Sequence, residues 1–119
     1  MYEYKARVHR IIDGDTVDVV IDLGFEMTTR QRIRLYGINT PETRTRDLEE
    51  KARGKAAKAR LYDLINGCNR EIIIKTKKRG KYGRILGSLL HPDTRQDFNK
   101  TLLKEGHAER MIFLWHLIY

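Results

Sequence analysis

The alternation of residues 15–23 constrains the fold more than any other feature of the sequence. The apolar positions are Val17, Val19, Ile21 and Leu23. Asp18 and Asp22 fall on the opposite face. A period of two residues is that of a β-strand with one face toward a core. We therefore predict a strand over 15–23, which follows a strand over 5–12 and a turn at Asp13-Gly14.

A third strand is predicted over 28–37, after the turn at Gly24. Ile33 and Leu35 are expected in the core, and Arg32, Arg34 and Tyr36 on the other face. Residues 38–46 are expected to form a loop, because Pro41 has no backbone N–H for a sheet and favours an extended residue before it.

The pattern becomes helical at Asp47, where acidic residues suit a helix N-terminus, and Asn66-Gly67 is a suitable end. The expected buried face is Leu48, Ala52, Ala56, Ala57, Leu61, Leu64 and Ile65. Two short strands follow, over 71–76 and 84–90. A second helix is predicted over 97–105, with Phe98 and Leu102 inward, and residues 111–119 are apolar enough to pack.

Five short strands with a helix between the third and fourth are typical of a Greek-key barrel of the OB type. We expect this β-barrel to carry two or three packed helices. A chain of 119 residues without internal repeats suits one domain over 1–119. Barrels of this type commonly bind oligonucleotides or oligosaccharides.

The charge favours a polyanionic partner. The chain has 24 Lys and Arg against 16 Asp and Glu, a net charge of +8, which favours DNA or RNA over a membrane surface. No apolar run is long enough to span a bilayer. The single Cys68 excludes an intramolecular disulfide. Without a visible secretory signal, we expect an intracellular monomer of bacterial, plasmid or phage origin, unless a signal is missing from this sequence.

Two acidic residues flank a glycine in the segment IDGDTV. Asp13 and Asp15 could form an anionic patch for a hard cation. The segment is no EF-hand loop, because Val17 stands where that loop needs an oxygen ligand. An ordinary turn, in which the aspartates bind nearby backbone amides, is the alternative.

The segment RLYGINTPE combines groups that phosphodiester cleavage needs. Arg34 could neutralise charge on the phosphate, Asn39 and Thr40 offer oxygen ligands, and Glu42 could deprotonate or orient water. The alternatives are a solvated strand face for Arg34 and a solvated loop for Glu42. Farther along, the segment KKRGKYGR holds five cations around Tyr82 and could grip a nucleic-acid backbone or form a plain hairpin turn.

These motifs in this order give a resemblance to the staphylococcal nuclease (thermonuclease-like) family. IDGDTV, RLYGINTPET and KYGR are followed by a helix ending in KEGHA, so the resemblance spans about residues 5–110. It implies an OB-fold barrel and a calcium-dependent nuclease. Such an enzyme would cleave DNA and RNA with little sequence preference and leave 3′-phosphate ends.

The resemblance also implies roles for individual residues. Asp15, Asn39 and Thr40 would bind the metal, with Asp13 as a supporting acid. Arg34 and Arg84 resemble the two arginines that bind phosphate and stabilise the transition state. Glu42 stands at the position of the proposed general base. Lys81 and Tyr82 fall where the family holds a substrate phosphate.

Three departures from the family pattern affect the expected chemistry. Asn39 stands where the family has a second metal-binding aspartate, so we expect weaker metal binding. Ile112 and Leu114 replace tyrosines of the nucleotide pocket, and the usual last helix has no counterpart. Two other functions therefore stay open: a nucleic-acid-binding module with a degraded metal site, and a protein-interaction domain that uses residues 111–119.

Overall fold

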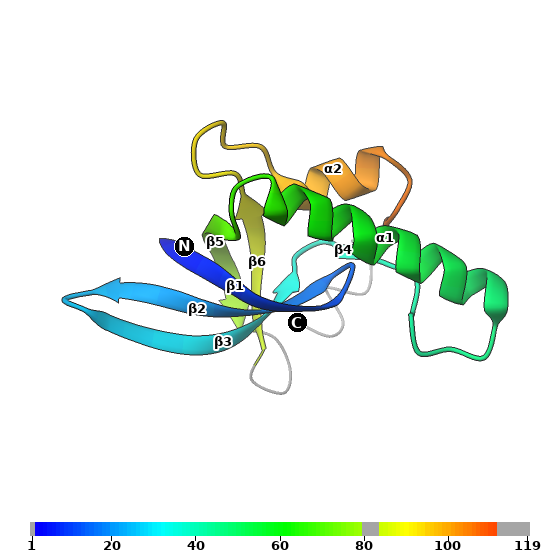
Figure 1. The fold of residues 1–119 in the computed structure, drawn as a ribbon, viewed down its shortest axis with the longest axis horizontal. Helices are drawn as coiled ribbons and strands as arrows, with labels where there is room; N and C mark the ends of the chain where they lie inside the picture. Colours follow the sequence, from blue (N-terminus) through cyan, green and yellow to red (C-terminus); the bar gives the residue numbers. More distant parts are fainter. Residues whose placement is uncertain (1, 80–83, 112–119) are drawn as a thin grey trace.

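The computed structural model of the chain describes residues 2–79 and 84–111. The strands are β1 (Glu3–Asp13), β2 (Thr16–Gly24), β3 (Met27–Leu35), β4 (Ile38–Asn39), β5 (Glu71–Arg79), β6 (Ile85–Leu90) and β7 (Glu109–Arg110). The helices are α1 (Leu48–Asn66) and α2 (Phe98–Lys104). Figure 1 shows both helices on one side of the sheet.

Five strands form a closed barrel in the order β1-β2-β3-β6-β5. All neighbours are antiparallel except β3 and β6, which run parallel with Ile33 opposite Ile85. Because α1 and β5 lie between β3 and β6 in sequence, the chain can return to place β6 beside β3. The predicted five-stranded barrel with packed helices is therefore confirmed.

The barrel is filled by the alternating apolar side chains of its strands. Fully buried residues include Val8, Val17, Ile33, Leu35, Ile72, Ile74 and Leu89. Phe98 and Leu102 of α2 and Leu61 and Ile65 of α1 are also fully buried and join this cluster. Burying each such side chain contributes about 1.5–3 kcal/mol, so the barrel and its helices form one packed core.

The ends of α1 were predicted correctly, but part of its buried face was not. The Asp47 carboxylate caps the helix by accepting hydrogen bonds from the backbone N–H groups of Glu49 and Glu50. The buried positions are Gly54, Ala57, Leu61 and Ile65, whereas Leu48 is 79% exposed and Ala52 and Ala56 are also exposed. Figure 1 shows the reason: the N-terminal part of α1 extends past the barrel.

The predicted loop over 38–46 begins with a short strand. Ile38 and Asn39 form β4, which pairs with Arg110 and Glu109 of β7. The Met111 N–H donates to the Gly37 carbonyl at 3.0 Å and extends this contact. Strands of two residues have no periodicity to detect, so the sequence did not reveal them.

The hairpin of β2 and β3 continues beyond the barrel (Figure 1). Leu23, predicted to face the core, is 45% exposed because the buried part of β2 ends at Ile21. Phe25 and Glu26 form the tip with φ values of 55° and 62°, which matches the two-residue turns preferred in β-hairpins. The third strand ends at Leu35, not at Gly37 as predicted.

Candidate active site

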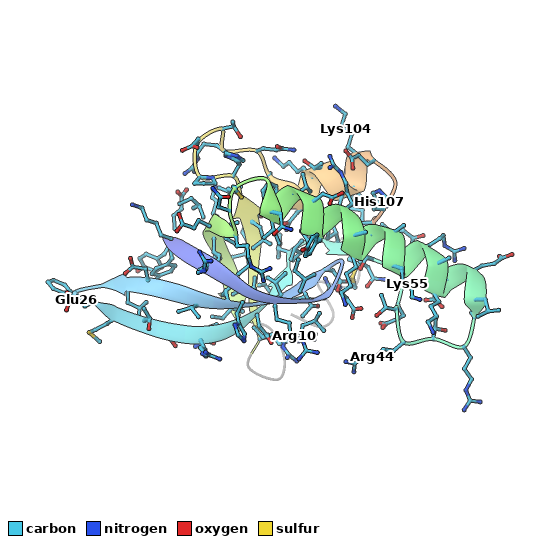
Figure 2. All side chains as sticks on the ribbon, viewed as in Figure 1. Arg10, Glu26, Arg44, Lys55, Lys104 and His107 are labelled. Atoms are coloured by element: carbon cyan, nitrogen blue, oxygen red, sulfur yellow. The ribbon has the colours of Figure 1, made fainter. Side chains whose placement is uncertain are left out.

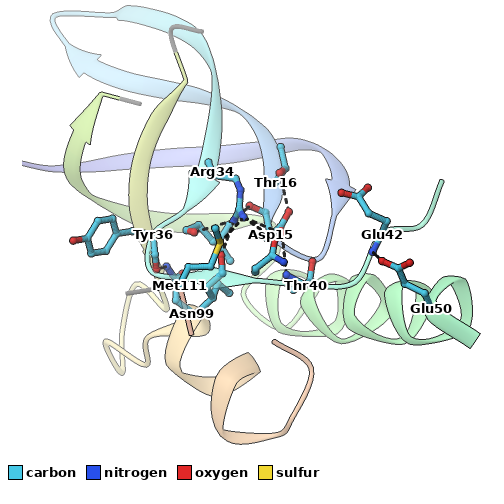
Figure 3. Close-up of polar contacts among 12 residues, drawn as sticks. Asp15, Thr16, Arg34, Tyr36, Thr40, Glu42, Glu50, Asn99 and Met111 are labelled. Carbon is cyan, nitrogen blue, oxygen red and sulfur yellow. Dashed lines mark hydrogen bonds and ion pairs between the residues drawn. The ribbon is translucent and has the colours of Figure 1, made fainter. Parts of the chain in front are cut away.

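Asp15 lies at the turn between β1 and β2, and its carboxylate is almost fully buried. Oδ1 accepts a hydrogen bond from Thr16 Oγ1 at 3.0 Å. Oδ2 accepts from the Thr40 backbone N–H at 3.0 Å and lies 3.3 Å from Arg34 Nη2. A buried carboxylate costs free energy unless it is paired and hydrogen-bonded, and Asp15 has both kinds of partner. Figure 3 shows these contacts converging between β2, β3 and the segment after β4.

Arg34 on β3 is 8% exposed, so the solvated strand face considered for it from sequence is wrong. Nη1 donates to the carbonyls of Leu35 and Ile38 at 3.1 and 2.9 Å, and Nη2 donates to Asn39 Oδ1 at 3.2 Å. The guanidinium thus connects β4 to β3 and is buried beneath the segment that we predicted as a loop.

One edge of the Arg34 guanidinium is less engaged with the protein. Nε donates to no described residue, and Nη2 also contacts Met111 Sδ at 3.6 Å, a weak acceptor. Because Nη2 is also bound by Asn39 and Asp15, the Nε–H is the Arg34 donor most available to an oxyanion.

Asn39 and Thr40 bring oxygen atoms close to Asp15. Asn39 Oδ1 shares Arg34 Nη2 with the Asp15 carboxylate, and Thr40 binds that carboxylate through its N–H. Thr40 Oγ1 is buried and has no hydrogen-bond partner among the described residues. The three residues predicted to bind metal therefore lie together. Within residues 2–79 and 84–111, no group of three or more His, Cys, Asp or Glu side chains could hold a metal ion.

The loop after Thr40 is fixed at two points. Asp13 Oδ1 accepts a hydrogen bond from Thr43 Oγ1 at 2.5 Å. On the other side the loop packs against α1, where a Cβ added to Gly54 would lie 2.6 Å from the Glu42 carbonyl oxygen. Asp13 therefore supports the loop that carries Glu42.

Glu42 is exposed on this loop. Its N–H faces Glu50 Oε1 at a long 3.5 Å, and its carboxylate makes no hydrogen bond or ion pair with a described residue. In Figure 3 the carboxylate points away from Glu50. It is therefore accessible to water.

Arg84 directly precedes β6 and shares a sheet face with Arg34. Arg34 lies opposite Leu86 in the parallel ladder, and Arg84 is two residues before Leu86. Because side chains alternate along a strand, both arginines project from the same face of the barrel. Arg84 is half-buried. Lys81 and Tyr82, predicted to bind substrate, and Ile112 and Leu114 lie outside the described residues.

The chain matches the family model described as staphylococcal nuclease homologue over residues 32–115. It belongs to this family. It is 30% identical to Protein ParB of Escherichia coli over 89% of this chain and 56% of that protein. It is 35% identical to Micrococcal nuclease of Shigella flexneri over 76% of this chain and 44% of that protein. It is 32% identical to Thermonuclease of Staphylococcus intermedius over 89% of this chain and 59% of that protein. The chain thus spans about half the length of these relatives.

Two residues that support the site of this staphylococcal nuclease homologue were missed in the sequence. Asn99, 3% exposed, donates from Nδ2 to the carbonyls of Tyr36 and Gly87 at 3.0 and 3.2 Å, which fixes α2 against the barrel. Gly54 allows the Glu42 loop to approach α1. The sequence could have indicated both residues. Asparagine and glycine are unfavourable inside a helix, so their presence in α2 and α1 suggests a structural role.

Two groups away from the site have shifted pKa values, Asp18 and Cys68. The Arg32 guanidinium, hydrogen-bonded to Asp18, lowers the pKa of that carboxyl. Burial raises the pKa of the Cys68 thiol, which keeps it protonated and a poor nucleophile at neutral pH. Neither α1 nor α2 is long and apolar enough to cross a membrane.

Proposed function

We propose that this chain is a metal-dependent nuclease that hydrolyses phosphodiester bonds of DNA and RNA and leaves 3′-phosphate ends. The observation that carries the proposal is the buried Asp15–Arg34 pair, whose surroundings combine oxygen ligands with phosphate-binding groups. Family membership and the similarity to proteins named as nucleases support it.

The donor set fits a hard divalent cation in kind. The Asp15 carboxylate, the Asn39 amide oxygen and the Thr40 main-chain carbonyl are all oxygen ligands, as Ca²⁺ prefers. Asp15 Oδ1 accepts only one hydrogen bond, so it can still accept a metal ion. With one carboxylate among three ligands, we expect weak binding, in the range of about 10⁻⁴–10⁻³ M found for extracellular calcium modules. When bound, the metal would neutralise negative charge that develops on the phosphate.

The protein groups divide the remaining work. Arg34 and Arg84 project from one face of the barrel and bind the phosphate oxygens, where planar guanidinium groups match the geometry. Glu42 accepts a proton from, or orients, the attacking water. The water oxygen forms a bond to phosphorus, the bond to the 5′ oxygen breaks, and that oxygen leaves as a hydroxyl after it gains a proton.

Weak sequence preference follows from the same residues. In this proposal Arg34, Arg84 and Glu42 contact the phosphate and the attacking water, and none of them contacts a base edge. Phosphate contacts position a nucleic acid without reading its sequence. We therefore expect cleavage at many sequences, in both DNA and RNA.

A binding module without catalysis is the second candidate, and Asn39 is the observation that favours it. Its amide is bound by Arg34 Nη2, and it supplies no charge beside Asp15. If the metal site is degraded, the basic chain would bind nucleic acid in a salt-dependent manner that is indifferent to calcium.

Cleavage of heat-denatured DNA, with calcium varied from none to about 10 mM and an EDTA control, tests the proposal. Arg84→Ala is the matched variant, because its side chain is less buried than that of Arg34. We expect calcium-dependent cleavage that the variant loses. DNA binding without cleavage at any calcium or magnesium concentration would establish the binding module instead.

A further inference from the structure

A basic groove lies beside the candidate active site, on the side away from Glu42. It has a volume of about 500 Å³ and is bounded by β4, β5, β6, α2 and β7. Its cations are Lys75, Lys77, Lys100, Arg110 and Arg95. Of the predicted site residues that the structure describes, none lines it.

Four of these cations are available to a ligand. Lys75, Lys77, Lys100 and Arg110 form no ion pair with a described residue. Arg95 differs, because both of its terminal nitrogens bind the Glu3 carboxylate at 2.7 Å.

The acidic groups near the groove are already engaged. Asp97, the acidic residue of the lining, accepts the Lys100 N–H as the cap of α2. Glu3 lies opposite Lys75 in the ladder of β1 and β5 but is bound to Arg95. The groove therefore carries a local excess of positive charge.

The walls of the groove also offer apolar and aromatic surface. Tyr36, Leu90 and Leu103 line it, and Lys77 Nζ lies 6.0 Å from the centroid of the Tyr36 ring. Unstacked bases pack on such surfaces while cations follow the backbone, which is how proteins bind single strands without sequence preference. A duplex would present mainly phosphates and leave the apolar wall unused.

The groove continues directly into the candidate site. Tyr36 is two residues from Arg34, and the Ile38 carbonyl that accepts from Arg34 Nη1 belongs to a residue that lines the groove. In Figure 3, Tyr36 and Glu42 lie on opposite sides of the Asp15–Arg34 pair. A strand in the groove would thus reach Arg34 before it reaches Glu42.

We propose that this groove binds the single-stranded nucleic acid next to the phosphate to be cleaved. Its cations contact phosphates, and its apolar wall receives bases. The proposal rests on the nuclease function for the meaning of the neighbouring site. The binding itself can be measured without catalysis.

The test compares two double variants with the same loss of charge. Lys77→Ala/Lys100→Ala removes groove cations. Lys5→Ala/Lys104→Ala removes exposed lysines that do not line the groove, and Figure 2 shows Lys104 at the far end of α2, pointing outward. Binding of a fluorescent oligothymidylate of about 12 nucleotides, within the ~4–16 that an OB barrel occupies, is measured by anisotropy in EDTA.

We expect the groove variant to lower the slope of log K against log salt by about 1.4, because each lost phosphate contact accounts for about 0.7. The same slope predicts an affinity loss of about 25-fold at 0.1 M salt relative to 1 M. The control should lose less, because neither Lys5 nor Lys104 lines the groove. Equal losses in both variants, or wild-type binding by the groove variant, would overturn the proposal.

Two further measurements separate the possible failures. A polyglutamate peptide that displaces the oligonucleotide at equal charge concentration would identify the groove as a site for acidic protein and refute the nucleic-acid proposal.

With active enzyme, the groove variant should have a higher KM than wild type for long single-stranded DNA. Its kcat/KM should match wild type for an aryl phosphodiester of one nucleotide, which is too short to fill the groove. If no substrate is cleaved, the nuclease proposal fails, whereas the anisotropy result still decides the groove.

Discussion

The two halves of the candidate site differ in how firmly the protein holds them. Asp15, Arg34 and Thr40 are 7%, 8% and 4% exposed and are bound to one another or to backbone carbonyls. Glu42 is exposed and its carboxylate has no described partner, and Arg84 is half-buried at the start of β6. The buried half holds β4 in place, in addition to the role that we propose for it in the chemistry. We therefore expect substitutions of Glu42 and Arg84 to disturb the fold less than substitutions of the buried half.

Substitution of the two arginines should show the difference between the two halves most clearly. Arg84→Ala should lower kcat by about 10²–10³, as loss of one transition-state donor does, with little change in thermal stability. Arg34→Ala should lower the rate at least as much. It should also reduce the free energy of unfolding by about 3–5 kcal/mol, because it leaves Asp15 buried without its ion pair.

Urea unfolding and single-turnover cleavage, measured on both variants, check this prediction. Arg34→Lys is the control, because it keeps the charge but not all of the hydrogen bonds, and it should recover part of the stability. Equal stability of Arg34→Ala and wild type would show that Arg34 does not stabilise the fold by holding β4 against β3.

Gly54→Ala should disturb the exposed half from a distance. The new Cβ would lie 2.6 Å from the Glu42 carbonyl oxygen and 2.8 Å from that of Pro41, so the loop must shift. A misplacement of about 1 Å can cost about 10²-fold in rate. Stability should change little, since alanine is favoured over glycine in a helix by roughly 0.5–1 kcal/mol and offsets part of the strain.

Ala56→Gly is the matched control on the exposed face of the same helix. It should cost roughly 0.5–1 kcal/mol of stability and leave the rate unchanged. Cleavage at saturating calcium and thermal melts separate the two effects. A fully active Gly54→Ala would mean that the position of Glu42 does not matter.

Asn39→Asp connects the two halves, because residue 39 is itself exposed but contacts the buried Arg34. A second carboxylate should lower the calcium concentration for half-maximal activity by about tenfold, through added ligand charge. Calcium titrations of both proteins check this shift. An unchanged midpoint would remove residue 39 from the metal site, whereas cleavage gained from an inactive wild type would make the natural protein a binding module.

The sequence predicted best those elements whose signals are local. Asp47 indicated the start of α1, because a cap acts within one turn. The alternation of Val17, Val19 and Ile21 identified the core face of β2. By contrast, the exposure of Leu48 and Leu23 depends on where the barrel ends, and no local pattern contains that information.

For the candidate site, the sequence supplied the residues but not their surroundings. The motifs predicted Asp15, Arg34, Asn39 and Thr40 as site residues, and these residues lie close together in the structure. Nothing in the sequence showed that Arg34 is buried, because the segment that covers it, β4 and β7, joins residues about seventy positions apart by two pairs. The roles of these residues remain predictions that the variants above can test.

The smallest expected effect concerns an ion pair outside the site. Asp18 lies opposite Arg32 in the ladder of β2 and β3 and binds it at 2.8 and 3.1 Å. The hydrogen bond from Arg32 lowers the pKa of Asp18 below its ordinary value of 3.8 in the folded protein. The pair therefore stabilises the fold above that value, and the contribution is lost as pH falls through the lowered pKa.

Because the pair is largely exposed, Asp18→Asn should cost less than about 1 kcal/mol at pH 7. Thermal melts should show the variant and wild type converging as the pH falls below the ordinary carboxyl pKa. Asp22→Asn, which keeps an oxygen for the Gly24 N–H, should show no such convergence. A difference between Asp18→Asn and wild type that persists in acid would attribute the effect to packing, not to charge.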